Sequence, residues 1–167
     1  MSLFFESHNL TLGYGNQLVI KNLDISLNFS KNYEITGKNG SGKTTLIMCI
    51  SNNFIGNTFN SNIRRKDTSL MEIGSSPSLM PELSLLENIK YFLFNDNINE
   101  KMITNVLDKY ELESFKSDIV GDFSSGMVKR SEIAIADLKN PKVLCICLLY
   151  TSPSPRDRQK SRMPSSA

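Results

Sequence analysis

A glycine-rich segment at residues 37–44, with the sequence GKNGSGKT, restricts the possible folds of this chain more than any other feature. It matches the pattern G-x-x-x-x-G-K-[ST] at every specified position. The preceding residues 33–36 (YEIT) have strand character, and Leu46, Ile47 and Ile50 recur at helical spacing after it. We therefore predict that the glycines occupy a turn between a strand and a helix, the structural context in which this pattern binds phosphate.

The chemistry of this segment suits a bound phosphate better than the alternative, a glycine-rich turn that binds nothing. Glycines let the backbone wrap around an anion with its N–H groups pointing inward, and the following helix adds its positive N-terminal dipole. Lys43 would reach the β- and γ-phosphates, which makes it the candidate catalytic residue, and the Thr44 hydroxyl would ligate Mg²⁺. The expected phosphate-binding residues are Gly37, Lys38, Asn39, Gly40, Ser41, Gly42, Lys43, Thr44 and Thr45.

The composition indicates one soluble domain without a membrane-spanning segment. The 167 residues suffice for a hydrophobic core, and no apolar run approaches the roughly 18 residues of a membrane helix. Three cysteines without convincing metal-ligand spacing suit a reducing compartment. Of the 19 basic and 17 acidic residues, four basic and one acidic lie in the last twenty positions, which leaves the rest at a net charge of −1. We therefore expect no direct nucleic-acid partner and no direct lipid insertion.

Strand patterns lie on both sides of the glycine-rich segment. Residues 3–12 and 18–29 are predicted strands joined by a turn at 13–16. Tyr14 on this turn is either a partly buried turn residue or a platform on which an adenine ring stacks. Further along we expect a polar hairpin or edge region at 57–65, a short strand at 68–73, a loop at 74–81, and a central strand at 141–146 covered on both faces.

Two amphipathic helices are predicted between that loop and the last strand. Ser84 and Glu87 form a capping box at the start of the first helix, which continues with an apolar stripe. We interpret both apolar stripes as packing faces. The face of the second helix comprises Met102, Ile103, Val106, Leu107 and Tyr110.

The segment 122–127, DFSSGM, precedes a further helical run from about Met127 to Leu138, which Asn140 and Pro141 close. Structurally it is an ordinary helix N-cap. Functionally, a serine hydroxyl and backbone N–H groups at a helix start form a second anion site. Two distant anion sites on one chain fit a dimer in which each chain completes the site of the other.

The order of these features resembles that of the ATP-binding cassette (ABC) transporter ATPases over residues 3–146. The family signature L-S-G-G-Q is matched at Ser124 and Gly126, whereas Met127 departs from its glutamine. The resemblance implies ATP and Mg²⁺ as ligands, with Tyr14 stacking on the adenine. It also implies that the signature residues cap the γ-phosphate held by another chain; these are Ser124, Ser125 and Gly126.

The resemblance further implies an α/β fold, a P-loop NTPase of the ABC-ATPase type. N-terminal antiparallel strands, a RecA-like core and a helical subdomain at about 77–125 would make up a domain of residues 1–146. The complete protein would pair head to tail with a second ATPase subunit and drive a transmembrane permease. It would lie at the cytoplasmic face of the inner (plasma) membrane, attached through that permease.

The segment 82–92, ELSLLENIKYF, resembles the haem-exporter ATPases of cytochrome c biogenesis, which implies haem export. The alternatives are the ATPase of another small ABC exporter or a non-transport P-loop protein. Among the latter, Asp118–Gly121 matches the D-x-x-G pattern of GTPases and kinases, but no N-K-x-D follows for guanine. A nucleotide-binding module of translation would carry two cassettes and basic linkers, which this chain lacks.

Two family features are missing from the sequence. No glutamine stands near Ser76, where the family has one that contacts Mg²⁺ and relays to the permease. The strand at 141–146 runs into Cys147 and Leu148, where the family has the Mg²⁺-side aspartate and the general-base glutamate. We therefore expect ATP binding without hydrolysis.

The segment from Cys147 to the last residue changes abruptly to a Ser-, Pro- and Arg-rich composition without periodicity. It resembles translated sequencing-adapter read-through, so we expect residues 147–167 to be a non-native, disordered tail on a C-terminally truncated domain. The alternative is a natural basic tail that binds anionic lipid or RNA.

Overall fold

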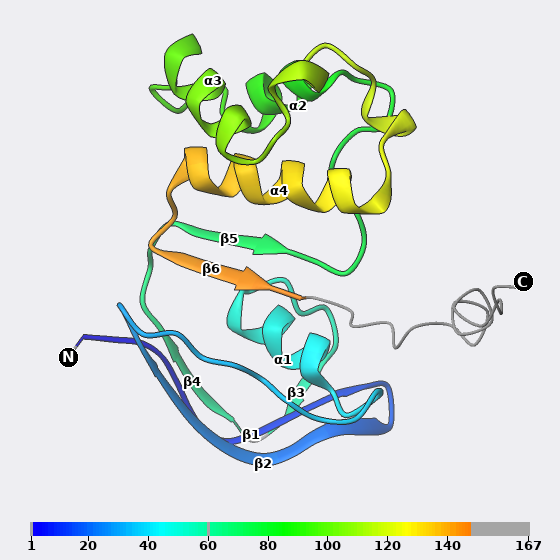
Figure 1. The fold of residues 1–167 in the computed structure, drawn as a ribbon. Coiled ribbons are helices and arrows are strands. Elements are labelled where there is room, and N and C mark those ends of the chain that lie inside the picture. The colour runs from blue at the N-terminus through cyan, green and yellow to red at the C-terminus, as the bar shows by residue number, and fades with distance from the viewer. Residues whose placement is uncertain (1, 60, 148–167) are drawn as a thin grey trace, which may run out of the picture.

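A computed structural model of the chain describes residues 2–59 and 61–147. Figure 1 shows a strongly curved antiparallel sheet, a small parallel sheet and a layer of helices stacked in that order, with one further helix between the two sheets. The predicted α/β class with N-terminal antiparallel strands is confirmed. Most of the expected non-native tail, residues 148–167, lies outside the described residues.

The antiparallel sheet is built around one long strand. β1 (Leu3–Tyr14) and β2 (Gln17–Asn28) form a hairpin in which Tyr14 is opposite Gln17 at the turn, as their apolar patterns predict. The expected hairpin at 57–65 is wrong, because β3 (Asn57–Phe59) and β4 (Asn62–Arg65) each pair antiparallel with β1. The alternative, an edge region, is right. β1 is long enough to pair with both short strands in succession along the edge that β2 leaves open.

The parallel sheet consists of β5 (Leu70–Ile73) and β6 (Val143–Ile146), both expected from their apolar runs. It lies between α1 (Lys43–Ile50) on one face and α4 (Ser125–Lys139) on the other (Figure 1). The strand expected at 33–36 does not form, and residues 31–38 have no assigned strand. A strand requires a pairing neighbour, and no described strand pairs with this segment.

The helical layer contains α2 (Leu85–Phe92), α3 (Glu100–Lys109), α4 and two short 3₁₀ turns, η1 (Glu113–Phe115) and η2 (Val120–Asp122). The predicted capping box is confirmed: Glu87 N donates to Ser84 Oγ at 3.2 Å, and Ser84 N donates to Glu87 Oε2 at 2.8 Å. The predicted packing faces of α2 and α3 meet α4 in one apolar core, except for Met102 of the predicted α3 face, which is 39% exposed and lies outside it. The buried members of this core are Leu79, Leu85, Ile89, Leu93, Ile103, Leu107, Leu112, Val120, Ala134, Ile135 and Leu138.

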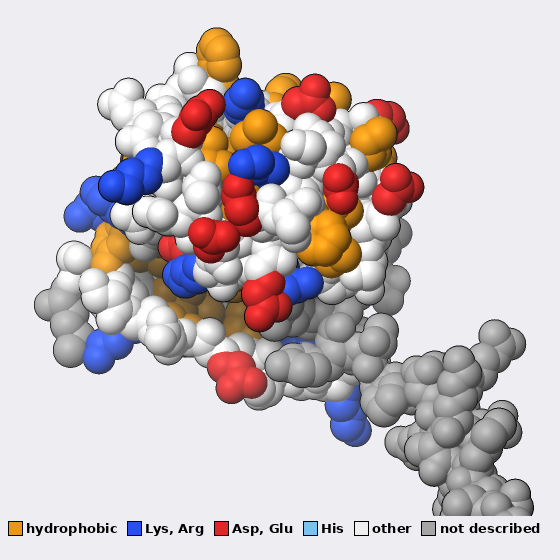
Figure 2. All heavy atoms as spheres, turned by 45° about the horizontal axis from the view of Figure 1, so that its top comes forward, with side chains coloured by type: hydrophobic (Ala, Val, Ile, Leu, Met, Phe, Trp, Pro, Cys, Tyr) orange, Lys and Arg blue, Asp and Glu red, His pale blue; other side chains and the backbone are white. Residues whose placement is uncertain are grey.

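The outer face of the helical layer is polar and mixed in charge. Figure 2 shows Lys, Arg, Asp and Glu side chains scattered over this face, with smaller apolar spots between them. Exposed ion pairs such as Lys109–Asp137 at 2.7 Å and Arg130–Glu111 at 3.1 Å lie on it. No helix in residues 2–59 and 61–147 is long and apolar enough to cross a bilayer.

An ion pair with a buried carboxylate and a partly exposed ammonium joins this helical layer to the loop after β5. Glu132 of α4 is 1% exposed and accepts hydrogen bonds from Ser78 N at 2.7 Å, Ser78 Oγ at 2.9 Å and Lys129 Nζ at 2.6 Å. Lys129 Nζ also donates to the Gly74 carbonyl at 2.9 Å. The carboxylate and the ammonium therefore replace their lost hydration with protein partners on both elements.

Removing Glu132 should unfold the chain more readily than removing an exposed partner. We expect Glu132→Ala to lower the free energy of unfolding by about 1–3 kcal/mol, because it leaves the Ser78 N–H without its acceptor and the partly exposed Lys129 ammonium with only the Gly74 carbonyl. The matched control is Glu111→Ala, which removes a carboxylate from an exposed pair and should cost about 0–1 kcal/mol. Urea unfolding followed by circular dichroism measures both, and equal losses would contradict the role given to the buried carboxylate of Glu132.

The apolar strand β6 differs from the central, doubly covered strand that its sequence predicts. Val143 and Cys145 pack toward α1, but Leu144 and Ile146 remain 41% and 38% exposed. Among the described residues β6 pairs only with β5, so its second edge has no backbone partner there. An exposed apolar edge is a template for pairing with another chain.

We expect Leu144→Lys to reduce self-association of the chain, because a charge on a strand edge opposes edge-to-edge pairing. Ile55→Lys is the control, since Ile55 is 94% exposed but belongs to no strand. Light scattering against protein concentration measures the effect. If Ile55→Lys improved dispersion as much as Leu144→Lys, exposed apolar area rather than the strand edge would be the cause.

Candidate nucleotide-binding site

The glycine-rich segment forms an open loop that ends at the first residue of α1. Gly42 is the N-cap of this helix with φ of 91°, and no side chain caps the first turn. A side chain at Gly42 would also meet β2, because an added Cβ would lie 2.8 Å from Val19 Cγ1. Glycine is therefore required here both by conformation and by contact. The uncapped N–H groups and the helix dipole leave this helix start suited to an anion.

Lys43 extends back across the loop from the first turn of α1. Its Nζ donates hydrogen bonds to the carbonyl oxygens of Gly37 and Lys38, each at 2.9 Å. These two bonds hold the ammonium over the loop, where a phosphate enclosed by the loop would meet it. The sequence predicted a cation at this place but not the carbonyls that hold it.

Thr44 lies beside a residue more than one hundred positions later in the chain. Its Oγ1 is 3.3 Å from Sγ of Cys147, which is 6% exposed. The backbone continues the parallel pairing at this point, since Cys147 N donates to the Ile73 carbonyl at 2.8 Å. The structure therefore places residue 147 next to the predicted Mg²⁺ ligand, as the resemblance implies.

The residues at this place fit a magnesium ion only in part. Mg²⁺ takes oxygen ligands, commonly one or two carboxylates together with phosphate oxygens. The Thr44 hydroxyl fits this chemistry, whereas the thiol of Cys147 is a soft ligand suited to other metals. Within the described residues no group of three or more Asp, Glu, His or Cys side chains could hold a metal.

The hairpin turn between β1 and β2 lies at the same end of the molecule as the start of α1 (Figure 1), and Tyr14 is the last residue of β1. It closes the β1–β2 hairpin, is 44% exposed, and packs edge-to-face against Phe54 with ring centroids 5.4 Å apart and an interplanar angle of 67°. One face of β2 near this hairpin also contacts Gly42. The structure thus brings the predicted aromatic platform and the predicted phosphate loop together.

The residues that match the family signature, 124–126, lie away from the phosphate loop. Ser124 caps α4, its Oγ accepting from Met127 N at 3.3 Å, which confirms the predicted N-cap and starts the helix two residues earlier than expected. Ser124, Ser125 and Gly126 are all exposed. They belong to the layer on the far side of the parallel sheet from α1 (Figure 1), so the two predicted anion sites are separate on one chain.

Sequence reasoning missed the residue that holds the other end of α1. Arg65 of β4 donates to the Ile50 carbonyl at 3.1 Å, to Asn52 Oδ1 at 2.7 Å and to the Cys49 carbonyl. A cation at a helix C-terminus satisfies its last carbonyls and opposes the negative end of the dipole. Arg65 belongs to a polar stretch with no recognisable pattern, so nothing in the sequence indicates this contact.

Two thiols near the parallel sheet, Cys145 of β6 and Cys49 of α1, have raised pKa values. Burial raises the pKa of Cys145 to about 11, and the negative charge of Glu72 adds to this effect. Burial likewise raises the pKa of Cys49, against a smaller opposing effect of Arg65. Both thiols therefore stay protonated near neutral pH and pack as small apolar groups.

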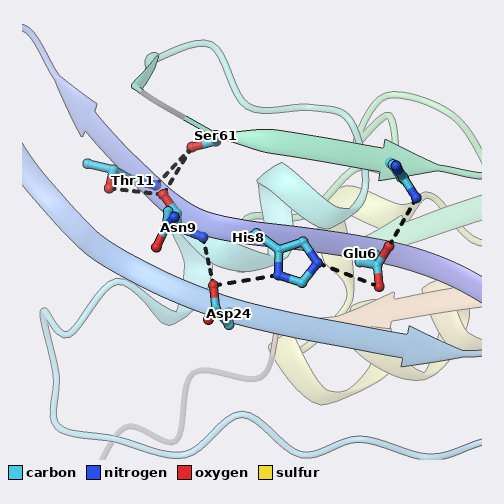
Figure 3. Close-up of polar contacts among 7 residues, drawn as sticks. Glu6, His8, Asn9, Thr11, Asp24 and Ser61 are labelled. Carbon is cyan, nitrogen blue, oxygen red and sulfur yellow. Dashed lines mark hydrogen bonds and ion pairs between the residues drawn. The ribbon is translucent and has the colours of Figure 1, made fainter.

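The only histidine, His8, belongs to a separate polar surface on the antiparallel sheet. Figure 3 shows its ring between the carboxylates of Glu6 and Asp24, each 3.9 Å from a ring nitrogen. Asp24 also accepts from Asn9 N at 2.7 Å. His8 is six strand residues from Tyr14, about 20 Å along β1. This surface takes no part in the nucleotide-binding site.

Comparisons with known proteins agree with this arrangement. The model of the family described as "ABC transporter" matches residues 20–146. The lantibiotic transport ATP-binding protein SrtF of Streptococcus pyogenes is 33% identical over 147 residues, which cover 83% of this chain and 63% of SrtF. The cytochrome c biogenesis ATP-binding export protein CcmA of Reclinomonas americana is 32% identical over 148 residues, covering 81% of this chain and 66% of CcmA. The chain therefore spans about two thirds or less of the length of these relatives.

Solved structures resemble the fold over most of the chain. A structure described as the ATP binding subunit of an ABC transporter superposes with a TM-score of 0.73 at 23% identity, covering 86% of this chain and 65% of that one. At this identity the likeness establishes the fold, and the family match over residues 20–146 establishes the kinship. The chain belongs to the ABC transporter family.

Proposed function

We propose that this chain binds MgATP as part of the ATPase subunit of an ABC exporter. The observation that carries the proposal is the complete phosphate loop, with Lys43 Nζ held over it at 2.9 Å from two loop carbonyls and Tyr14 at the hairpin turn that lies at the same end of the molecule. Residues 37–45 would enclose the phosphates through their N–H groups, and Tyr14 would stack on the adenine. Lys43 would neutralise charge on the β- and γ-phosphates.

The proposed assembly is a head-to-tail pair of ATPase subunits attached to a permease at the cytoplasmic face of the membrane. The separation of the two anion sites supports it, because Ser124, Ser125 and Gly126 are exposed at a helix start but lie away from their own phosphate loop. A second chain could bring its phosphate loop to them. Residues 1–146 would form the ATP-binding domain, with a helical subdomain at about 77–125.

Binding without turnover is the second part of the proposal. Hydrolysis requires a positioned water as well as neutralised charge, and general base catalysis alone is worth about 10²–10⁴ in rate. The thiol of Cys147 occupies the place beside Thr44 where the family has a carboxylate. Lys43 and the loop therefore supply charge neutralisation, and no described residue beside them supplies a base.

Export is the proposed direction of transport, and haem is a specific candidate cargo. The segment 82–92 resembles haem-exporter ATPases, and one relative is named for export in cytochrome c biogenesis. A similarly close relative is named for lantibiotic transport, which makes a lantibiotic the alternative. Reconstitution with each class of permease separates them, since only the matching permease should stimulate or retain this subunit.

Loss of Lys43 should weaken ATP binding. We expect Lys43→Ala to raise the dissociation constant for ATP about 10- to 150-fold, because it removes a charge-assisted contact of about 1.5–3 kcal/mol. Lys21→Ala is the matched control, since Lys21 is an exposed lysine of β2 outside the loop. Isothermal titration calorimetry with ATP measures both. Unchanged affinity in Lys43→Ala would refute nucleotide binding by the loop.

A carboxylate at position 147 should restore the contribution of Mg²⁺ to binding. We expect Cys147→Asp to tighten ATP binding about tenfold in the presence of Mg²⁺ and not in excess chelator, because the new oxygen ligand lies beside Thr44. Cys147→Ser controls for size without charge. Single-turnover assays should show no hydrolysis by the parent or by either variant. Hydrolysis by the parent that Lys43→Ala abolishes would overturn the proposed inactivity.

A further inference from the structure

Tyr14 is an exposed aromatic residue on a turn flanked by two glycines. It stands between Gly13 and Gly15, and Gly15 has φ of 55°, a conformation that glycine adopts freely. A stacking platform gains affinity only when its ring already lies in the plane that the base requires. The β1–β2 turn alone does not impose that plane on a ring that is 44% exposed.

Phe54 supplies the missing support. Its ring meets Tyr14 edge-to-face, with centroids 5.4 Å apart and an interplanar angle of 67°. Phe54 is itself half-buried and packs against the core of the antiparallel sheet. This contact holds one side of the Tyr14 ring, and because an edge-to-face pair covers at most one flat face of each ring, at least one face of Tyr14 remains for a base.

The segment that carries Phe54 is fitted closely to the hairpin turn. An added Cβ at Gly56 would lie 2.4 Å from Phe54 Cζ and 2.4 Å from the Gly13 carbonyl oxygen, so only glycine allows this approach. Asn57 pairs with Gly13 in the sheet, and its Nδ2 donates to the Gly15 carbonyl at 3.2 Å. Residues 54–57 therefore contact the residues on both sides of Tyr14 as well as its ring.

The same segment directly follows the helix that begins at the phosphate loop. α1 has eight residues, a length of about 12 Å, and Arg65 holds its C-terminal carbonyls. The end of α1 thus positions Phe54, and the start of α1 forms the phosphate site. One short helix connects the two parts of the site that would hold the two ends of a nucleotide.

We infer that Phe54 is a positioning residue for the nucleotide base: it holds the Tyr14 ring in the plane on which a purine stacks. This inference rests on the proposed ATP binding and adds a specific role to it. Phe54 contributes to the affinity for a ligand that carries a base and contributes nothing to the affinity for a bare polyphosphate. Its effect passes entirely through Tyr14.

The test compares ATP with inorganic tripolyphosphate, which fits the phosphate loop but has no base. Calorimetry on the full chain would measure both ligands with Phe54→Leu, Tyr14→Ala and the double variant. We expect Phe54→Leu to weaken ATP binding about threefold to tenfold and to leave tripolyphosphate binding unchanged. In the Tyr14→Ala background, Phe54→Leu should have no further effect on ATP.

Two further variants separate positioning from general stability. Phe54→His keeps an aromatic ring against Tyr14 without adding an atom at the position of Cζ, which lies close to Gly56, and should retain most of the parental ATP affinity. Gly56→Ala places a methyl group in the contact and should weaken ATP binding without changing tripolyphosphate binding. Thermal melts of every variant identify any that fail to fold, and the remaining variants decide the question.

The calorimetric results can refute the role of Phe54 separately from the proposed ATP binding. An equal loss for ATP and tripolyphosphate in Phe54→Leu, or full additivity with Tyr14→Ala, would overturn the positioning role while ATP binding stands. A parent chain that binds neither ligand would overturn the proposed function and the inference with it. An ATP-specific loss that vanishes in the Tyr14→Ala background supports both.

Discussion

The position of helix α1 is the constraint on which the rest of the site depends. Its first residue follows a glycine pressed against β2, and Arg65 binds its last carbonyls. Leu46, Cys49 and Ile50 are buried in the core shared with the antiparallel sheet and β6. A helix fixed at both ends and along one face presents its N-terminal N–H groups in one direction, which an anion site requires.

The other parts of the site take their places from this helix. Lys43 reaches back over the loop from its first turn, and Thr44 faces Cys147 from the adjacent position. Phe54, a few residues after the helix ends, contacts Tyr14. Groups that would meet the phosphates, the metal ion and the base are thereby tied to one element, so a small displacement of α1 would disturb all three contacts together.

The helical layer is joined to this core by polar as well as apolar contacts. The Lys129–Glu132 ion pair binds the loop after β5 through the Gly74 carbonyl and Ser78. Apolar packing is non-directional, whereas these bonds require one placement of α4 relative to the loop. The exposed Ser124 at the start of α4 consequently has a defined position relative to the parallel sheet, although it is remote from the phosphate loop.

The sequence by itself determined the features that depend on neighbouring residues. The glycine pattern and the following apolar spacing predicted the loop and α1, alternation predicted β1 and β2, and the capping box predicted the start of α2. In each case the forces act within one turn of helix or along one strand, so the local pattern carries the information. The signature and the loop together also sufficed to indicate the family, which the comparisons then established.

Only the tertiary structure decided which distant groups meet. The segment 33–36 has strand character but pairs with no strand in the described part of the chain. The strands β3 and β4 pair with the open edge of β1, and their own residues do not reveal this pairing. The contacts of Arg65 with α1, of Glu132 with Ser78 and of Phe54 with Tyr14 join residues with no shared pattern. Such contacts depend on how whole elements pack, because backbone pairing and side-chain burial are settled between elements far apart in sequence.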